Sequence, residues 1–197
     1  MSAAPLRVGA DGWLVGIRRV PSANCDARPP GAAVELLVIH NISLPPGRFG
    51  SGCIERLFGN SLDAAAHPFL ELLAGLRVSA HFLIERNGGI TQFVSCNERA
   101  WHAGASSFEG RAGCNDYSVG VELEGTDFTA FDPAQYAALA RLTSALRRAF
   151  PLRAARGHSD IAPGRKTDPG PLFDWRAFAA QARLPAQWLP AQRAARC

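Results

Sequence analysis

Two histidines and one aspartate are the residues of this sequence best suited to bind a metal. His40 follows the apolar run AVELLVI, His158 lies in the segment GHSD, and Asp168 comes ten residues later in KTDPG. Two imidazoles and one carboxylate are typical of catalytic zinc sites, which keep a further position open for water. The three residues are far apart in sequence, and no local motif of the HExxH type fixes their geometry. Spacing alone is therefore a weak signal for this site.

Two carboxylates, Glu122 and Glu124, lie in the segment YSVGVELEG, whose alternating pattern predicts a strand. They share one face of that strand with Gly120. A carboxylate in an otherwise apolar strand is costly to bury without a partner. We expect Glu122 to be a general base that activates water. The alternative is an exposed residue on an edge strand, and the pattern does not separate Glu122 from Glu124.

Lys166 is the only lysine in a chain with 21 lysines and arginines. It lies two residues before Asp168, so its ammonium group would reach the same centre and stabilise an oxyanion there. The alternative is a solvated loop lysine.

Of the other histidines, His67 precedes a helix break and has no expected function, and His81 opens an apolar strand. His102, in RAWHAG, is expected either to line a substrate groove or to be a structural loop residue.

Hydrophobic periodicity and turn residues predict strands that alternate with helices. We expect strands at 33–40 and 117–125, a hairpin at 79–95 around NGG, helices at 55–60, 62–76 with a break at Pro68, and 132–150, and a short helix from about Asp174. Residues 41–52 and 155–175 are predicted to be loops. His40 would then end a strand at the edge of a sheet. This order predicts an α/β fold with a central mixed β-sheet flanked by helices, in a single domain at 1–197 with its core at about 12–182.

The bulk properties favour an ordinary globular protein. The length of 197 residues suits one domain, and the net charge of +4 is spread along the chain without a basic run, so a nucleic-acid partner is not expected. No apolar stretch is long enough to span a bilayer, and Arg7 and Asp11 interrupt the region where an export signal would lie. We therefore expect a cytoplasmic protein without a membrane partner. The five scattered cysteines predict free thiols.

A series of sequence blocks resembles the AmpD-type N-acetyl-anhydromuramyl-L-alanine amidases, which belong to the wider amidase-2 and peptidoglycan-recognition-protein group. The resemblance runs from GWLV at residue 12 to FDW at residue 175. Its blocks include VIHNISLPPGRFG, LRVSAHFLI, RAWHAG, CNDYSVGVELEGTD and GHSDIAPGRKTDPGPLFDW. Several blocks are long and keep the family order, so the match is specific.

The resemblance implies a zinc ion held by His40, His158 and Asp168, with Glu122 and Lys166 as the catalytic pair. It implies hydrolysis of the amide between the muramyl lactyl group and L-alanine. The substrate would be anhydromuropeptide, a soluble fragment released in peptidoglycan turnover and returned for recycling. We expect the protein to act as a monomer on this small molecule.

The resemblance also implies a substrate groove that includes Asn41 and Trp101. Arg77, in LRVSAH, matches a family arginine that meets a carboxylate of the peptide stem. The family often has a second arginine directly before CND, where this chain has Gly113. Arg111 or Arg165 would have to replace it, so the departure concerns affinity for the stem peptide and leaves the cleaved bond unaffected.

Two other functions share much of this pattern. An amidase of intact cell wall, either periplasmic or of the phage endolysin type, would use the same zinc site. A non-catalytic peptidoglycan-recognition module is disfavoured because such modules often lack the complete metal set. Activity on whole sacculi and a zinc assay would separate these alternatives.

Overall fold

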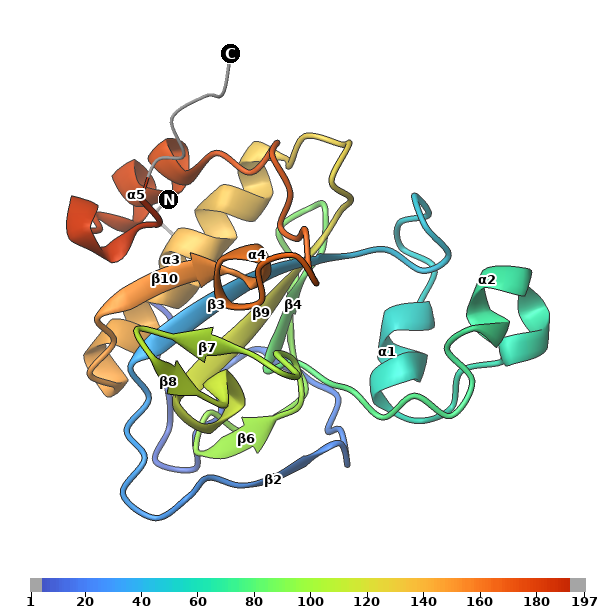
Figure 1. Cartoon of the computed structure of the whole chain (residues 1–197), viewed down its shortest axis with the longest axis horizontal. Helices are drawn as coiled ribbons and strands as arrows, with labels where there is room; N and C mark the ends of the chain where they lie inside the picture. Colours follow the sequence, from blue (N-terminus) through green and yellow to red (C-terminus); the bar gives the residue numbers. More distant parts are fainter. Residues whose placement is uncertain (1–4, 192–197) are drawn as a thin grey trace.

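A six-stranded mixed β-sheet forms the centre of the computed structural model, which describes residues 5–191 (Figure 1). The strand order is β1–β5–β4–β9–β3–β10, and every neighbouring pair is parallel except the antiparallel hairpin of β4 and β5. The strands are β1 (Arg18–Arg19), β3 (Leu36–Ile42), β4 (Phe82–Ile84), β5 (Ile90–Gln92), β9 (Ser118–Glu124) and β10 (Ala154–Gly157). The expected α/β fold with a central mixed sheet is therefore confirmed.

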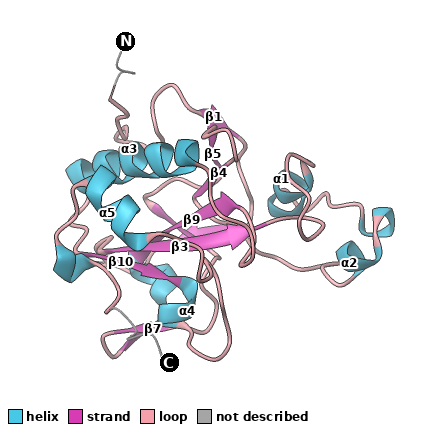
Figure 2. Cartoon of the chain, turned by 90° about the horizontal axis from the view of Figure 1, so that it is seen from above, coloured by secondary structure: helices cyan, strands magenta, loops and turns pink. Residues whose placement is uncertain are grey.

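Helices lie on both sides of the sheet and beyond its edge. Figure 2 shows α3 and α5 on one side of the sheet, α4 on the other, and α1 and α2 displaced to one end. The helices are α1 (Cys53–Phe58), α2 (Pro68–Glu71), α3 (Pro133–Ala149), α4 (His158–Ile161) and α5 (Trp175–Ala182), with 3-10 turns η1 (Ala64–Ala66), η2 (Cys114–Tyr117) and η3 (Ala186–Trp188). Two small ribbons pair β2 (Cys25–Ala27) with β6 (Glu98–Ala100), and β7 (Ser107–Phe108) with β8 (Arg111–Ala112).

The two faces of the sheet differ in their apolar packing: one face has a single large cluster, and the other has two separate clusters. On the α3 side, Leu37 and Ile39 of β3 join one large apolar cluster that includes α3 and α5. On the opposite side, Val38 belongs to a cluster with α4, whereas Ile42 packs against a separate cluster around α1. Side chains alternate along a strand, so His40 lies on this second face between the two clusters.

His40 does not end its strand, contrary to the expectation from the sequence. β3 continues to Ile42, because Asn41 and Ile42 pair with Leu123 and Glu124 of β9 in a parallel ladder. β3 also lies between β9 and β10 and so is not an edge strand. The polar Asn41 was misleading because backbone pairing in the interior of a sheet outweighs the preference of a single side chain.

Other predicted elements agree with the structure to different degrees. The hairpin, the strand around residue 120, the long helix after Asp132 and the short helix after Asp174 are confirmed. The predicted helix 62–76 is reduced to η1 and α2, and Pro68 begins α2 with His67 as its N-cap, whose Nδ1 accepts the N–H of Phe69 at 3.0 Å. The loop predicted from residue 155 instead begins as the end of β10 and continues as α4.

Four cysteines, Cys25, Cys53, Cys96 and Cys114, are free thiols, while Cys197 lies outside the described residues. Within residues 5–191, no helix has the length and apolar character needed to cross a membrane.

Gly120 marks the closest approach between the sheet and the segment that follows β6. A Cβ at this position would lie 2.4 Å from Cγ of His102. We expect Gly120→Ala to lower the free energy of unfolding by about 1–3 kcal/mol, as for other overpacked interiors, in urea denaturation. In a His102→Ala background the same change should cost clearly less, because the overlapping ring is gone. An equal cost in both backgrounds would contradict the packing explanation.

Candidate metal centre and active site

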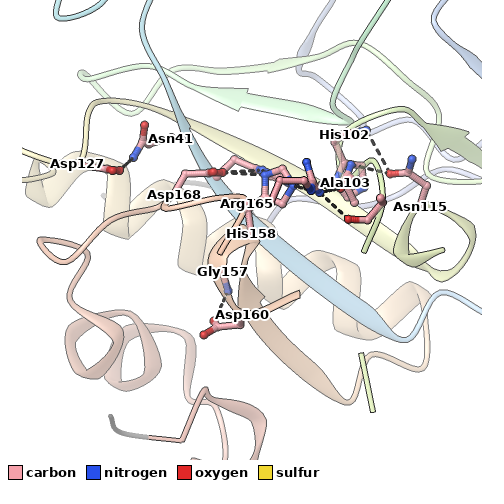
Figure 3. Close-up of polar contacts among 12 residues, drawn as sticks. Asn41, His102, Ala103, Asn115, Asp127, Gly157, His158, Asp160, Arg165 and Asp168 are labelled. Carbon is pink, nitrogen blue, oxygen red and sulfur yellow. Dashed lines mark hydrogen bonds and ion pairs between the residues drawn. The ribbon is translucent and has the colours of Figure 1, made fainter. Parts of the chain in front are cut away.

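His40, His158 and Asp168 converge at one point on the face of the sheet opposite α3. Nδ1 of His40 lies 3.0 Å from Nδ1 of His158 and 2.9 Å from Oδ2 of Asp168, and Nδ1 of His158 lies 3.1 Å from the same oxygen. Figure 3 shows His158 and Asp168 turned toward this point. The convergence follows from topology: β10 pairs in parallel with β3, and its last residue, Gly157, lies opposite Ile39, so the next residue reaches the level of His40.

The electrostatics of the cluster favour an ionised Asp168 beside a neutral His40. Burial alone would raise the pKa of Asp168, but its contacts with His158 and His40 outweigh this effect and lower that pKa well below its usual value. Burial lowers the pKa of His40, against the opposing effect of Asp168. Neutral imidazole and ionised carboxylate are the protonation states in which these groups bind metals.

The donor set could therefore hold a divalent metal. Three ligating atoms within about 3 Å of one another suit a small ion with bonds of about 2.0–2.2 Å, and two imidazoles with one carboxylate suit zinc. A second observation supports a reactive centre here. Among the described residues, Oε2 of Glu122 is a buried side-chain oxygen with no hydrogen-bond partner. Such an atom is costly to leave unpaired, so it marks a position suited to a water or substrate group.

The structure separates Glu122 from Glu124, which the strand pattern could not. Glu122 lies beside His40 in the register of β9 with β3. Glu124 already has hydrogen-bond partners, because its carboxylate accepts the backbone N–H groups of Gly50 and Arg86. Both carboxylates are on one face of the strand, but only that of Glu122 has an unpaired oxygen beside the cluster.

The pKa of Glu122 is raised well above its usual value, first by burial and then by the negative charge of Asp168, while Lys166 acts in the opposite direction. A raised pKa strengthens a carboxylate as a proton acceptor. Lys166 itself is exposed, and its charge also lowers the pKa of His40, so its ammonium group is electrostatically coupled to the centre.

Asn41 and Trp101 both make hydrogen bonds to other residues of the protein. Asn41 donates from Nδ2 to Oδ1 of Asp127 at 2.7 Å, which ties the residue after His40 to the loop after β9. Trp101 exchanges hydrogen bonds with Ser79 through its backbone. The pKa of Asp26 is lowered, first by its hydrogen bonds with Arg99 and to a smaller extent by one with the side chain of Trp101.

Of the three arginines Arg77, Arg111 and Arg165, it is Arg165 that contacts the cluster, with Nη2 3.5 Å from Nε2 of His158. Arg77 is exposed in a hollow of about 120 Å³ between α1 and the segment after α2. Arg165 donates to the carbonyl oxygens of Ala103 and Ala105 at 2.7 and 2.6 Å. Arg111 stacks on the ring of Tyr117, with its guanidinium carbon 4.0 Å from the ring centroid.

Gly113, which stands where the family often has arginine, adopts a left-handed backbone with φ of 72°. Its position directly precedes η2, and a Cβ there would lie 3.2 Å from Oδ2 of Asp116. A side chain at this position would be strained, so the local backbone favours glycine.

The sequence predictions missed a buried layer behind the cluster of His40, His158 and Asp168. His102 does not line a groove: it is buried, with Nδ1 3.0 Å from Nε2 of His40. His81, which directly precedes β4, is also buried; its Nδ1 accepts the N–H of Gly120, and burial lowers its pKa to about 3. Arg28 contacts His81 and donates to several backbone carbonyls. A glycine in the middle of a strand is the one sequence signal that could have indicated this close approach.

The fold and the cluster together define a class of protein: an α/β domain with a His-His-Asp cluster that could hold a metal on one face of its central sheet. The family model for N-acetylmuramoyl-L-alanine amidase matches residues 30–171 of the chain. The chain belongs to this family.

Individual relatives agree with this assignment. The chain is 56% identical over 169 residues to 1,6-anhydro-N-acetylmuramyl-L-alanine amidase AmpD of Escherichia coli K12. This alignment covers 85% of the present chain and 92% of the relative. A crystal structure of a selenomethionine AmpD derivative is similar with a TM-score of 0.83 and 53% identity, over 87% of this chain and 97% of the other. The E. coli amidase AmiD, solved with an anhydro-N-acetylmuramic acid peptide as substrate, has a TM-score of 0.57 and 29% identity, over 92% and 67% of the two chains. The resemblance seen in the sequence is thereby confirmed.

The cluster predicts one divalent metal site per chain. Equilibrium dialysis followed by elemental analysis should find close to one zinc per wild-type chain. His158→Ala should lose most of this zinc, because it removes one of three protein ligands. His67→Ala is the matched control, since His67 caps α2 outside the cluster, and it should keep wild-type zinc. Full occupancy in the His158 variant would exclude that residue as a ligand.

Proposed function

We propose that the protein is a zinc-dependent N-acetylmuramoyl-L-alanine amidase. It hydrolyses the amide between the lactyl group of (anhydro-)N-acetylmuramic acid and L-alanine in peptidoglycan fragments during cell-wall recycling. The observation that carries the proposal is the unpaired, buried oxygen of Glu122 beside the cluster of His40, His158 and Asp168. The names of the AmpD relatives and the substrate in the AmiD complex support this choice of bond.

The proposed ligands of zinc are His40, His158 and Asp168. When bound there, zinc supplies Lewis-acid polarisation of a carbonyl and lowers the pKa of a water molecule. The three side chains would be the protein's ligands to this ion, a donor set typical of catalytic zinc sites. The lowered pKa of Asp168 supports this role, since an ionised carboxylate is needed.

Glu122 acts on protons in this mechanism. Its buried carboxylate takes a proton from the water that attacks the lactyl carbonyl, and its raised pKa supports this role. The same carboxyl group then gives the proton to the departing amine of L-alanine. Lys166 donates to the oxyanion that forms on the carbonyl oxygen, a contribution of about 3–4 kcal/mol in comparable sites.

Substrate binding is assigned to residues around this centre. Asn41 and Trp101 border the reacting amide, and Arg77 meets a carboxylate of the peptide stem. Arg165 contributes from the loop between His158 and Asp168. Because Gly113 stands in place of a family arginine, we expect the stem peptide to depend mainly on Arg77. The proposal includes a monomer acting in the cytoplasm on a soluble muropeptide, without nucleic-acid or membrane partners.

Mass spectrometry of digested anhydromuropeptide tests the reaction directly. We expect release of the free stem peptide and of anhydro-N-acetylmuramic acid by the zinc-loaded protein. A chelator should abolish the reaction, and added zinc should restore it. Whole sacculi should be cleaved much more slowly than the soluble fragment. Peptide release that persists at full rate in the chelated protein would refute zinc dependence, and faster cleavage of sacculi would favour a wall amidase.

Glu122→Gln keeps the size of the side chain but removes the base. We expect the rate constant kcat to fall by about 10²–10⁴-fold, because a positioned general base contributes that much. Zinc content should stay at the wild-type level, since Glu122 is not a proposed ligand. Glu85→Gln, which changes a half-buried carboxylate directly after β4, is the control and should keep wild-type kcat. A Glu122 variant with wild-type turnover would disprove the assignment.

A further inference from the structure

The nitrogens of His40 and His158 that face away from the metal cluster both contact the same dipeptide. Nε2 of His40 lies 3.0 Å from Nδ1 of His102, and Nε2 of His158 lies 3.1 Å from the carbonyl oxygen of Ala103. Two ligands from distant parts of the chain are thus oriented by consecutive residues. Partners of this kind fix the ring orientation and tautomer of metal-binding histidines.

The shortest contact of His158 on this side favours one tautomer. A carbonyl oxygen can only accept, so the 3.1 Å contact with Ala103 favours a proton on Nε2 of His158. Nη2 of Arg165 lies farther from this nitrogen, at 3.5 Å, and donates to the same carbonyl oxygen at 2.7 Å. Nδ1 of His158 then has a free lone pair, and this atom is the one that faces Asp168 and His40.

His40 needs the same tautomer for its Nδ1 to act as a ligand. Its Nε2–H then donates to Nδ1 of His102, whose own Nε2–H donates to Oγ of Ser118 at 3.1 Å. The serine hydroxyl can accept this bond. The result is a directed chain of hydrogen bonds in which Nε2 of His40 donates to His102 and His102 donates to Ser118.

The ring of His102 has little freedom to leave this arrangement. It is buried, it packs edge-on against His40 and His81 with centroid distances of 5.1 and 5.8 Å, and it fills the space that a side chain at Gly120 would take. Its geometry is therefore set by packing as well as by hydrogen bonds.

One side-chain atom holds the backbone of this dipeptide. Oδ1 of Asn115, in η2, accepts the N–H groups of His102 and Ala103 at 3.2 and 2.8 Å, as Figure 3 shows. Without this oxygen, two buried donors would lose their partner, and the backbone would be free to shift. Any such shift moves the acceptors of both ligand histidines together.

We propose that Asn115 is a positioning residue of the metal centre, which holds His102 and Ala103 so that His40 and His158 both present Nδ1 before metal binds. The proposal rests on the metal site of the proposed function. Its own prediction concerns the ring tautomers in metal-free protein and can therefore be tested separately.

The experiment compares Asn115→Leu with Asn115→Asp. Leucine removes the accepting oxygen at similar size, whereas aspartate retains it. Long-range ¹H–¹⁵N NMR of metal-free protein reads the tautomer of each histidine ring, and competition with a chromophoric chelator measures zinc affinity. For Asn115→Leu we expect mixed tautomers at both His40 and His158 and zinc affinity lower by about 10–100-fold. Asn115→Asp should restore the wild-type tautomers and most of the affinity.

A second pair of variants acts on one ligand only. His102→Leu removes the acceptor of His40, and His102→Asn keeps an oxygen near the position of Nδ1. We expect His102→Leu to disturb the tautomer of His40 while His158 stays wild type, and His102→Asn to reverse this change. This pair decides the question if Asn115→Leu does not fold.

Wild-type tautomers and wild-type zinc affinity in both leucine variants would overturn the proposal. So would a loss of affinity with unchanged tautomers in metal-free protein, which would indicate only a structural role. The zinc content and anhydromuropeptide hydrolysis of the wild-type protein test the proposed function independently of these variants.

Discussion

The parallel pairing of β3 with β9 is the interaction on which the rest of the site depends. It sets His40 directly opposite Glu122, so an imidazole of the His-His-Asp cluster and a buried carboxylate share one face of the sheet. The adjacent pairing of β10 with β3 then delivers His158 to the same level at the start of α4. A shift of one residue in either register would turn these side chains to the α3 face, because side chains alternate along a strand. The apolar cluster against α3 holds the register, since a shift would also expose Leu37 and Ile39.

The cost of burying so many polar groups is met by pairing them with one another. His40, His81, His102 and His158 are all buried on one side of the sheet, and each has hydrogen-bond partners. Burial lowers the pKa of His40, His81 and His102, so these rings stay neutral, as metal binding and directed hydrogen bonds both require. Glu122 is the exception, with an unpaired oxygen that favours a reacting partner over a structural one.

The two faces of the sheet differ in polarity, and this difference explains how the fold stays stable with so many buried polar groups. The α3 face carries one continuous apolar cluster, which supplies stability through burial. The opposite face has two smaller clusters, and the polar groups lie in the interval between them. The segment from Trp101 to Ala105 closes that interval from behind, held by Asn115 and Arg165. Stability and reactivity are thus assigned to different sides of the same sheet.

The sequence by itself determined the class of fold, the hairpin, the long helix after Asp132 and the residue types of the site, because hydrophobic period, capping residues and turn glycines act locally. It also carried the resemblance that named His40, His158, Asp168, Glu122 and Lys166. Only the tertiary structure decided that His40 lies within its strand and that His102 lies behind the His-His-Asp cluster. It also decided that the carboxylate of Glu124 has hydrogen-bond partners while one oxygen of Glu122 has none. These facts depend on strand order and register between segments up to 128 residues apart, as for His40 and Asp168. Local preferences do not contain that information, because it arises from which strands pair and which faces they bury.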